Sequence, residues 1–209
     1  FAGSSRKLGT QMKATGEVMS IAPCFEMAIM KAVRGAEIKL DTLNLPRFRG
    51  IDIRKKLHDT DDLRLFAIFE ALRQDVPIDE IHKITRVDRW FLGKLKHLSD
   101  FEKQLDAEGL TGENYLTGKK YGYTDVALTR LTGQKIEKPR LPVYKMVDTC
   151  GGEFAAETPY FYSSMDDVCE AREMIAADSS NREKIIVLGS GPIRIGQGIE
   201  FDYSSVHCA

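Results

Sequence analysis

A glycine-rich turn near the C-terminal end carries the residues best suited to chemistry. Residues 184–188 predict a buried parallel strand by their apolar run, and glycines follow at positions 189, 191 and 196. Glycines after a strand let the backbone approach a ligand, and the next helix N-terminus offers free N–H groups to an anion. The dinucleotide fingerprint, however, needs its third glycine where Arg194 stands, and no Walker A Gly-Lys-Ser/Thr follows. The pattern favours a tight structural turn over a nucleotide site.

A charged group follows this turn. Arg194, Glu200 and Asp202 lie within nine positions, partly on a predicted helix. A solvated helix face is the ordinary interpretation of such a group, because charged side chains are mostly exposed. A polar passage lined by an arginine and carboxylates is the second interpretation, and the spacing alone does not favour it.

Cysteine and histidine are too scattered to predict a catalytic or metal site. A nucleophilic Cys150 needs a neighbouring base, which His58, His82, His97 or His207 could supply only by folding close to it. We therefore interpret Cys150 as a small buried hydrophobe. The four cysteines have no knuckle or Cys-x-x-Cys spacing, which is typical of a reducing compartment and predicts a cytoplasmic protein.

Trp90 and Phe91 stand among basic residues, as they would in a nucleic-acid-binding helix. The same predicted helix also carries Asp88, Asp100 and Glu102, and the whole chain has 30 Lys+Arg against 31 Asp+Glu. This balance argues against binding to nucleic acid or to an anionic membrane. The two aromatic residues are instead expected to anchor the core or an interface. Because no apolar run reaches about 18 residues, no membrane span is predicted.

The elements around these residues are mostly helical. Helical periodicity is clear in residues 25–33, across most of 52–105 and in 124–133, with Phe91 predicted to join Leu95, Leu98, Phe101 and Leu105 in one buried stripe. β-Branched and aromatic runs predict strands at 143–147 and 160–162. The 209 residues are therefore expected to form a mainly α fold flanked by incomplete α/β segments, as in a piece of a longer protein.

Several motifs together resemble the large chain of carbamoyl-phosphate synthase over essentially the full length. They are TQMKATGEVM (10–19), ITRVDRWFL (84–92), KYGYTD (120–125), VYKMVDTC (143–150) and VLGSGPIRIGQGIEFDY (187–203). The resemblance implies three parts: the end of the first, carboxyphosphate ATP-grasp domain at 1–36, a helical oligomerisation domain at 37–180, and the start of the second, carbamoyl-phosphate synthetase domain at 181–209.

The resemblance also implies the activity of the parent enzyme. That ligase makes carbamoyl phosphate for arginine and pyrimidine synthesis from bicarbonate, glutamine-derived ammonia and ATP, using Mg²⁺ (or Mn²⁺) and K⁺. The catalytic, ATP-binding and metal-binding groups of the family lie outside this segment, so the segment should hold no cofactor and no activity by itself. Implied partners are a second copy, through the helical domain, and the glutamine amidotransferase small chain.

The family passes its carbamate intermediate through an internal tunnel. Matching the glycine-rich motif residue by residue assigns tunnel-lining roles to Arg194, Gly198 and Glu200. The alternative to all of this is an independent helical interaction module that ends in a nucleotide-binding turn. Such a module should be a monomer with nucleotide affinity, whereas the first interpretation predicts self-association without ATP hydrolysis.

Overall fold

The fold is mainly α-helical, as the sequence predicts. The computed structural model describes residues 3–14, 16–48, 50–155, 157–180, 182–189, 191, 193–194 and 200–208. Within these ranges the helices are α1 (Phe25–Gly35), α2 (Ile53–Lys56), α3 (Arg64–Arg73), α4 (Ile78–Thr85), α5 (Arg89–Glu108), α6 (Gly112–Lys120), α7 (Asp125–Thr132), α8 (Glu170–Ala177) and α9 (Glu200–Cys208), with a 3₁₀ turn at Pro46–Phe48. The strands are β1 (Gly16–Glu17), β2 (Val143–Met146), β3 (Phe161–Ser164) and β4 (Ile193–Arg194).

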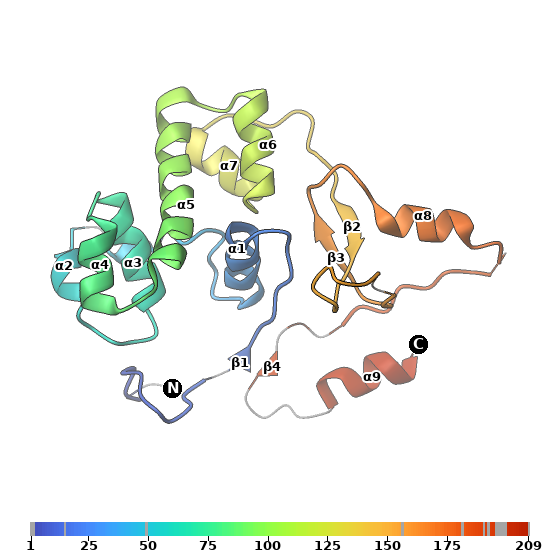
Figure 1. Cartoon of the computed structure of the whole chain (residues 1–209), viewed down its shortest axis with the longest axis horizontal. Coiled ribbons are helices and arrows are strands. Elements are labelled where there is room, and N and C mark those ends of the chain that lie inside the picture. Colours follow the sequence, from blue (N-terminus) through green and yellow to red (C-terminus); the bar gives the residue numbers. More distant parts are fainter. Residues whose placement is uncertain are drawn as a thin grey trace.

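The long helix α5 is the axis of the helical body. Figure 1 shows α2, α3 and α4 on one side of it, and α1, α6 and α7 on the other. Asp88 begins α5, since its carboxylate accepts a hydrogen bond from the Trp90 N–H at 2.7 Å. The helix ends at Gly109, whose φ of 71° favours glycine. Both ends of α5 are therefore set by local residue types.

The prediction that Phe91 belongs to the buried stripe of α5 is wrong. Leu95, Leu98, Phe101 and Leu105 are buried as expected, but Phe91 is 44% exposed and its neighbour Leu92 is fully buried instead. The helix is packed on opposite sides by α3 and α4 and by α1 and α7. Leu92 therefore extends the apolar face toward the core, and Phe91 falls outside it.

Helix α6 was not predicted, because glycines at 109 and 112 resemble loop punctuation. Its start is fixed by a capping box: the Thr111 hydroxyl accepts from the Asn114 N–H at 3.2 Å, and the Asn114 side chain accepts from the Thr111 N–H at 2.7 Å. Helix α7 follows as predicted. Thr124 caps it, and Gly133 ends it in the left-handed region.

The apolar core lies between Met27 and Leu128. It joins all the helices from α1 to α7 except α6, which contributes partly buried side chains. Its fully buried members include Phe69, Leu72, Ile81, Leu92, Leu98, Tyr123 and Leu128. The apolar residues after position 142 are at best partly buried in the part of the chain that is described, so stability must come mainly from the helical body.

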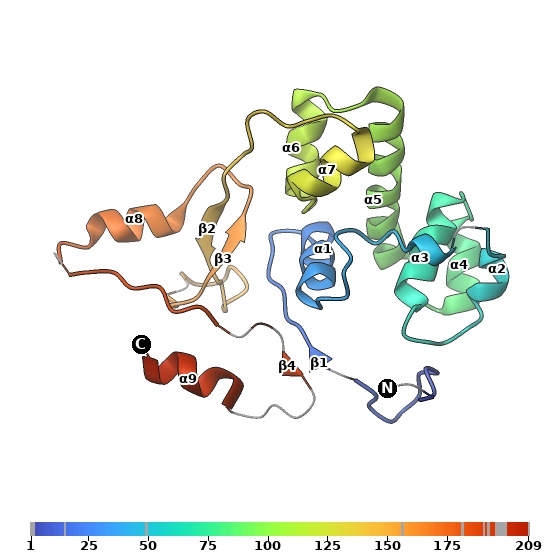
Figure 2. The same ribbon diagram turned by 180° about the vertical axis from the view of Figure 1, so that it is seen from behind.

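The hairpin module, which we define as β2, β3 and α8, extends from the helical body. Strands β2 and β3 pair antiparallel with Val143 opposite Ser164 and Met146 opposite Phe161, which confirms the predicted strands. Helix α8 packs along β2. Figures 1 and 2 show the module beside α1, separated from α2–α4 by the rest of the body.

Residues 184–188 do not form a strand, so that prediction is wrong. Residues 182–189 have no regular secondary structure, and the Ile185, Ile186 and Leu188 side chains are 84–86% exposed. A parallel strand is stable only when neighbours cover both faces, and no strand pairs with this run in the described residues. Further along, β4 pairs antiparallel with β1, and α9 confirms the predicted helix after the glycine-rich turn.

No helix in the described ranges is long and apolar enough to span a membrane.

Candidate interaction surfaces

The three predicted tunnel residues are placed only in part. Arg194 lies in β4, where its backbone is opposite Gly16 of β1, and Glu200 is the first residue of α9. Gly198 and the side chains of Arg194 and Glu200 lie outside the described residues. Their tunnel-lining roles therefore stay predictions, as do the domain boundaries after residues 36 and 180.

An aromatic surface is formed where the start of α1 meets the start of α5. The ring centroids of Phe25, Trp90 and Phe91 are 5.0–5.7 Å apart, in edge-on or tilted arrangements. Trp90 is 55% exposed, and the Lys94 ammonium lies 5.4 Å from its ring centroid. The sequence predicted core or interface anchors. Exposure excludes a core role for Trp90 and Phe91, and an interface role stays a prediction.

A buried carboxylate joins the same two helices beneath this surface. Glu26 is only 3% exposed, and its Oε1 lies 2.9 Å from His97 Nδ1 and 3.3 Å from Lys94 Nζ. Burial acts to raise the pKa of Glu26, but the hydrogen bonds from His97 and Lys94 outweigh it and leave that pKa below its usual value. Glu26 is therefore a charged clamp between α1 and α5.

A second buried carboxylate, Glu102, lies between α3, α5 and the turn before α7. Tyr123 donates to Glu102 Oε1 at 3.2 Å, while Arg73 Nε stays 3.7 Å from Oε2, which accepts no hydrogen bond. Burial raises the pKa of Glu102 to about 7, although the positive charge of Arg73 and the Tyr123 hydrogen bond act to lower it. A pKa in this range means that Glu102 is partly protonated near neutral pH in the folded chain.

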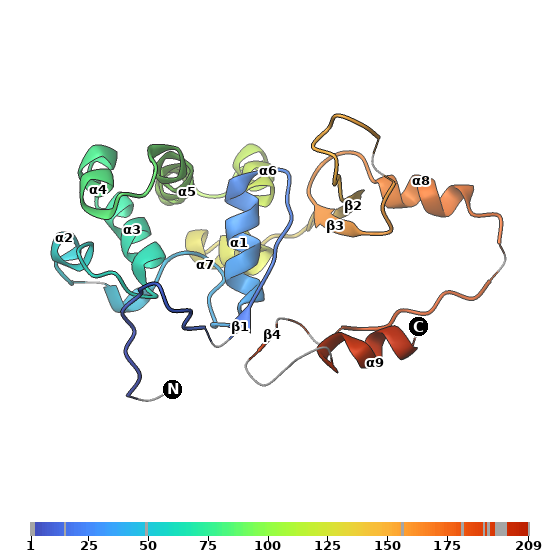
Figure 3. The same cartoon turned by 60° about the horizontal axis from the view of Figure 1, so that its bottom comes forward.

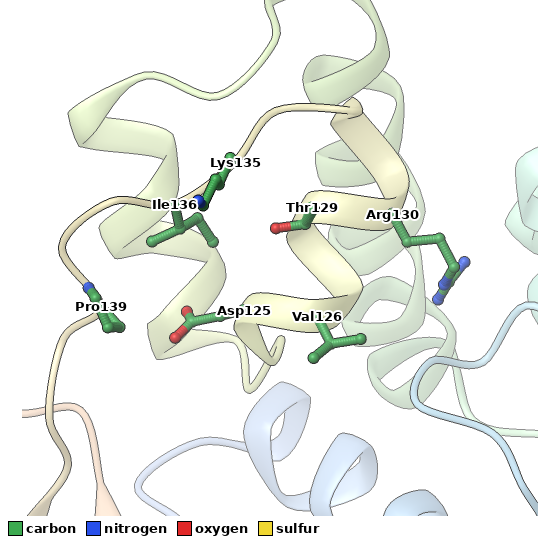
Figure 4. A pocket seen from close by; sticks show the side chains of 7 residues that line it. All are labelled: Asp125, Val126, Thr129, Arg130, Lys135, Ile136 and Pro139. Atoms are coloured by element: carbon green, nitrogen blue, oxygen red, sulfur yellow. The ribbon is translucent and has the colours of Figure 1, made fainter.

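A shallow cleft of about 450 Å³ lies between α7 and the segment that leads to β2. Figure 4 shows Asp125 and Thr129 directed toward this segment, which contributes Lys135, Ile136 and Pro139. Asp125 is held by Lys119 at 2.9 Å. The cleft is lined mostly by apolar atoms.

Cys150 is exposed, which corrects the interpretation of a buried hydrophobe. It lies in the turn after β2, outside the core, where its N–H donates to the Asp148 carboxylate at 2.8 Å. All four cysteines are free thiols. Among the residues whose placement is given, no three His, Cys, Asp or Glu side chains gather as a metal site would require.

By its fold, the chain is a helical domain that carries a small α/β module. Comparison with known proteins identifies the family within this class. The family model of the carbamoyl-phosphate synthetase large chain, oligomerisation domain, matches residues 17–143, and that of the carbamoyl phosphate synthase preATP-grasp domain matches residues 181–209.

Curated relatives agree over the whole chain. The carbamoyl phosphate synthase large chain of Agathobacter rectalis is 45% identical over 219 residues, which cover 100% of this chain and 20% of the relative. The large chains of Lachnoclostridium phytofermentans and Caldanaerobacter subterraneus are each 44% identical to this chain. Each match covers 99% of this chain and 20% of the relative. The chain belongs to the carbamoyl-phosphate synthase large-chain family, and it spans about a fifth of the length of these relatives.

Sequence reasoning did not identify the two buried carboxylates. Glu26 follows Phe25 in a helix that was predicted from its regularly spaced apolar residues. Glu102 follows Phe101, which belongs to the predicted buried stripe. A carboxylate beside an apolar stripe was the available signal. This signal does not show which side chains contact each carboxylate. His97, for example, is 71 positions away from Glu26 in the sequence.

Proposed function

We propose that this chain is the central segment of a carbamoyl phosphate synthase large chain, where it joins two synthetase halves and self-associates through its helical domain. The observation that carries the proposal is the oligomerisation-domain match over residues 17–143, followed by a preATP-grasp match at 181–209. The half-exposed aromatic surface is consistent with a partner, because Trp and other large aromatics dominate the binding energy of interfaces.

In the intact protein the segment would serve a cytoplasmic, ATP-dependent ligase that supplies carbamoyl phosphate to arginine and pyrimidine synthesis. That ligase would use bicarbonate, glutamine-derived ammonia, ATP, Mg²⁺ (or Mn²⁺) and K⁺, and a glutamine amidotransferase small chain would be its partner. Phosphoryl transfer needs metal ions and cations placed around the ATP phosphates. We assign those groups to the flanking parts of the enzyme and expect no activity from this segment alone.

The test is mass in solution by light scattering across a concentration series, with an ATP hydrolysis assay on the same sample. Reversible self-association without hydrolysis is the expected result. A strict monomer that hydrolyses or tightly binds ATP would contradict the proposal and favour the alternative, an independent helical module with a nucleotide-binding turn.

We also propose that Arg194, Gly198 and Glu200 line part of the tunnel for the intermediate. A glycine at 198 would leave the bore open, and the two charged residues would give it polar walls. Replacing Gly198 with a bulky residue in the intact enzyme should stop overall synthesis while each partial ATP-dependent reaction survives. Unchanged overall synthesis would show that the assignment is wrong.

A further inference from the structure

Lys31 of α1 binds two segments that are far apart in the sequence. Its ammonium donates to the Ile21 carbonyl at 2.8 Å and to the Ser163 carbonyl at 3.0 Å. The same nitrogen lies 5.6 Å from the centroid of the Tyr162 ring. Ile21 belongs to the leading segment, which we define as residues 16–24, and Ser163 belongs to β3 of the hairpin module.

The hairpin module has few other means of attachment to the helical body. Ser164 is its one buried residue among those described, so no apolar core fixes it. A second polar contact is made by Arg140, whose guanidinium donates to the Asp166 carbonyl at 2.9 Å and whose N–H donates to the Tyr115 hydroxyl at 2.7 Å. The position of the module therefore depends on a few charged and polar contacts.

A separate feature brings the leading segment to the same part of the molecule. Strand β1 pairs antiparallel with β4, with Gly16 opposite Arg194 and Glu17 opposite Ile193. Figure 3 shows β1 and β4 together below α1, between the body and the hairpin module. Backbone that precedes the helical domain thus lies against backbone that follows it.

We propose that Lys31 is a positioning residue that couples the leading segment to the hairpin module. The ammonium has three donors and no acceptor, so one side chain can hold two carbonyls and face an aromatic ring at once. If the proposed function holds, these two segments adjoin the two synthetase halves. Lys31 would then transmit a displacement of one segment to the other segment.

The experiment is hydrogen–deuterium exchange on the whole 209-residue chain, comparing Lys31→Met with the unchanged protein. Methionine keeps an unbranched stem of similar length and removes the charge-assisted hydrogen bonds. Exchange should become about tenfold faster in both residues 16–24 and residues 161–164, and stay unchanged in α5. Lys83→Met, at an exposed position of α4, is the matched control and should alter neither segment.

A faster exchange in only one segment, or in neither, would overturn the proposal. The Lys31→Met chain could unfold, and exchange would then be faster in every segment. In that case the Tyr162→Leu variant tests the proposal instead. This variant removes the ring that faces the ammonium and should speed exchange in both segments to a smaller extent. A change confined to β3 would show that the contact is local and that no coupling exists.

The outcome is separable from that of the proposed function. A chain that self-associates normally but shows no coupled exchange contradicts the role of Lys31 alone. A chain that stays monomeric and binds ATP contradicts the proposed function, and the exchange comparison then still decides whether Lys31 couples the two segments.

Discussion

At the scale of single residues, close packing restricts the turn between α6 and α7 to glycine. Gly122 has a φ of +91°, and a Cβ added there would lie 3.1 Å from Met27 Cα and 3.2 Å from Met30 Cβ. Its carbonyl also accepts from Arg34 at 2.6 Å. The backbone of this turn therefore lies directly against α1.

We expect Gly122→Ala to lower the free energy of unfolding by about 3 kcal/mol, through backbone strain and overpacking together. Gly133→Ala is the matched control, because Gly133 also has positive φ but a Cβ there would meet nothing within 4 Å. The control should cost only about 1 kcal/mol in urea denaturation. Equal losses for the two variants would show that contact with α1 does not matter.

Glu102 should make stability depend on pH near neutrality. Its pKa is raised to about 7 in the folded chain, chiefly by burial, from an ordinary value near 4.5. Between these values the folded chain holds a proton that the unfolded chain has lost. The free energy of unfolding should therefore fall as pH rises through this window and level off above about pH 7.

Glu102→Gln tests this directly. The neutral amide should make the chain more stable than the unchanged protein at about pH 8, on the order of 2 kcal/mol, and the difference should vanish near pH 4.5. Urea denaturation at several pH values measures it. Asp106→Asn, at an exposed position of the same helix, should leave the pH profile unaltered. A pH-independent effect of Glu102→Gln would exclude a raised pKa.

At the scale of elements, α1 is held by charge at one end and by apolar packing along its length. Met30 and Val33 enter the core, while Glu26 meets Lys94 and His97 near the N-terminus of α1. Breaking a buried charged cluster by removing one partner is more costly than its net contribution, since the remaining charges lose their compensation. The first turn of α1 is thus sensitive to single substitutions.

Glu26→Gln should destabilise the chain by about 2 kcal/mol at neutral pH, because two charge-assisted hydrogen bonds lose their anionic acceptor. The pKa of Glu26 is lowered in the folded chain, so this stabilisation is present above about pH 4.5 and is lost as pH falls through the folded value. Thermal unfolding at neutral and at acid pH measures both effects. The exposed Glu137→Gln should cause neither, and a loss that persists unchanged in acid would contradict the clamp.

At the scale of the whole molecule, stability is uneven along the chain. The core is built from residues 27–128, whereas the segment from 178 to 189 has no regular structure where it is described and exposes Ile185, Ile186 and Leu188. Exposed, irregular backbone opens to proteases more readily than packed helices. The helical body should therefore survive a cut in this segment.

Limited digestion with trypsin should cleave first after Arg182 or Lys184 and leave a product that keeps the helical far-ultraviolet spectrum. Mass spectrometry identifies the product. First cleavage at Lys96 or Lys103, both on α5, would show instead that the helical body opens before the segment does.

The sequence by itself determined the family, the mainly α class and the α5, α7 and hairpin elements. These depend on local information: apolar periodicity, a capping residue such as Thr124, β-branched runs, and motifs along the chain. It missed α6, whose capping box is a side-chain arrangement that two glycines obscure, and it predicted a strand at 184–188 that needs neighbours to form.

Only the tertiary structure decided which residues meet. The Glu26 clamp joins positions 71 apart, and Lys31 reaches a carbonyl 132 positions away. Likewise, the burial of Leu92 in place of Phe91 follows from how α1, α3 and α4 pack around α5. A periodic pattern predicts that a helix has an apolar face. The neighbouring helices decide how that face is rotated and which partners its charged residues meet.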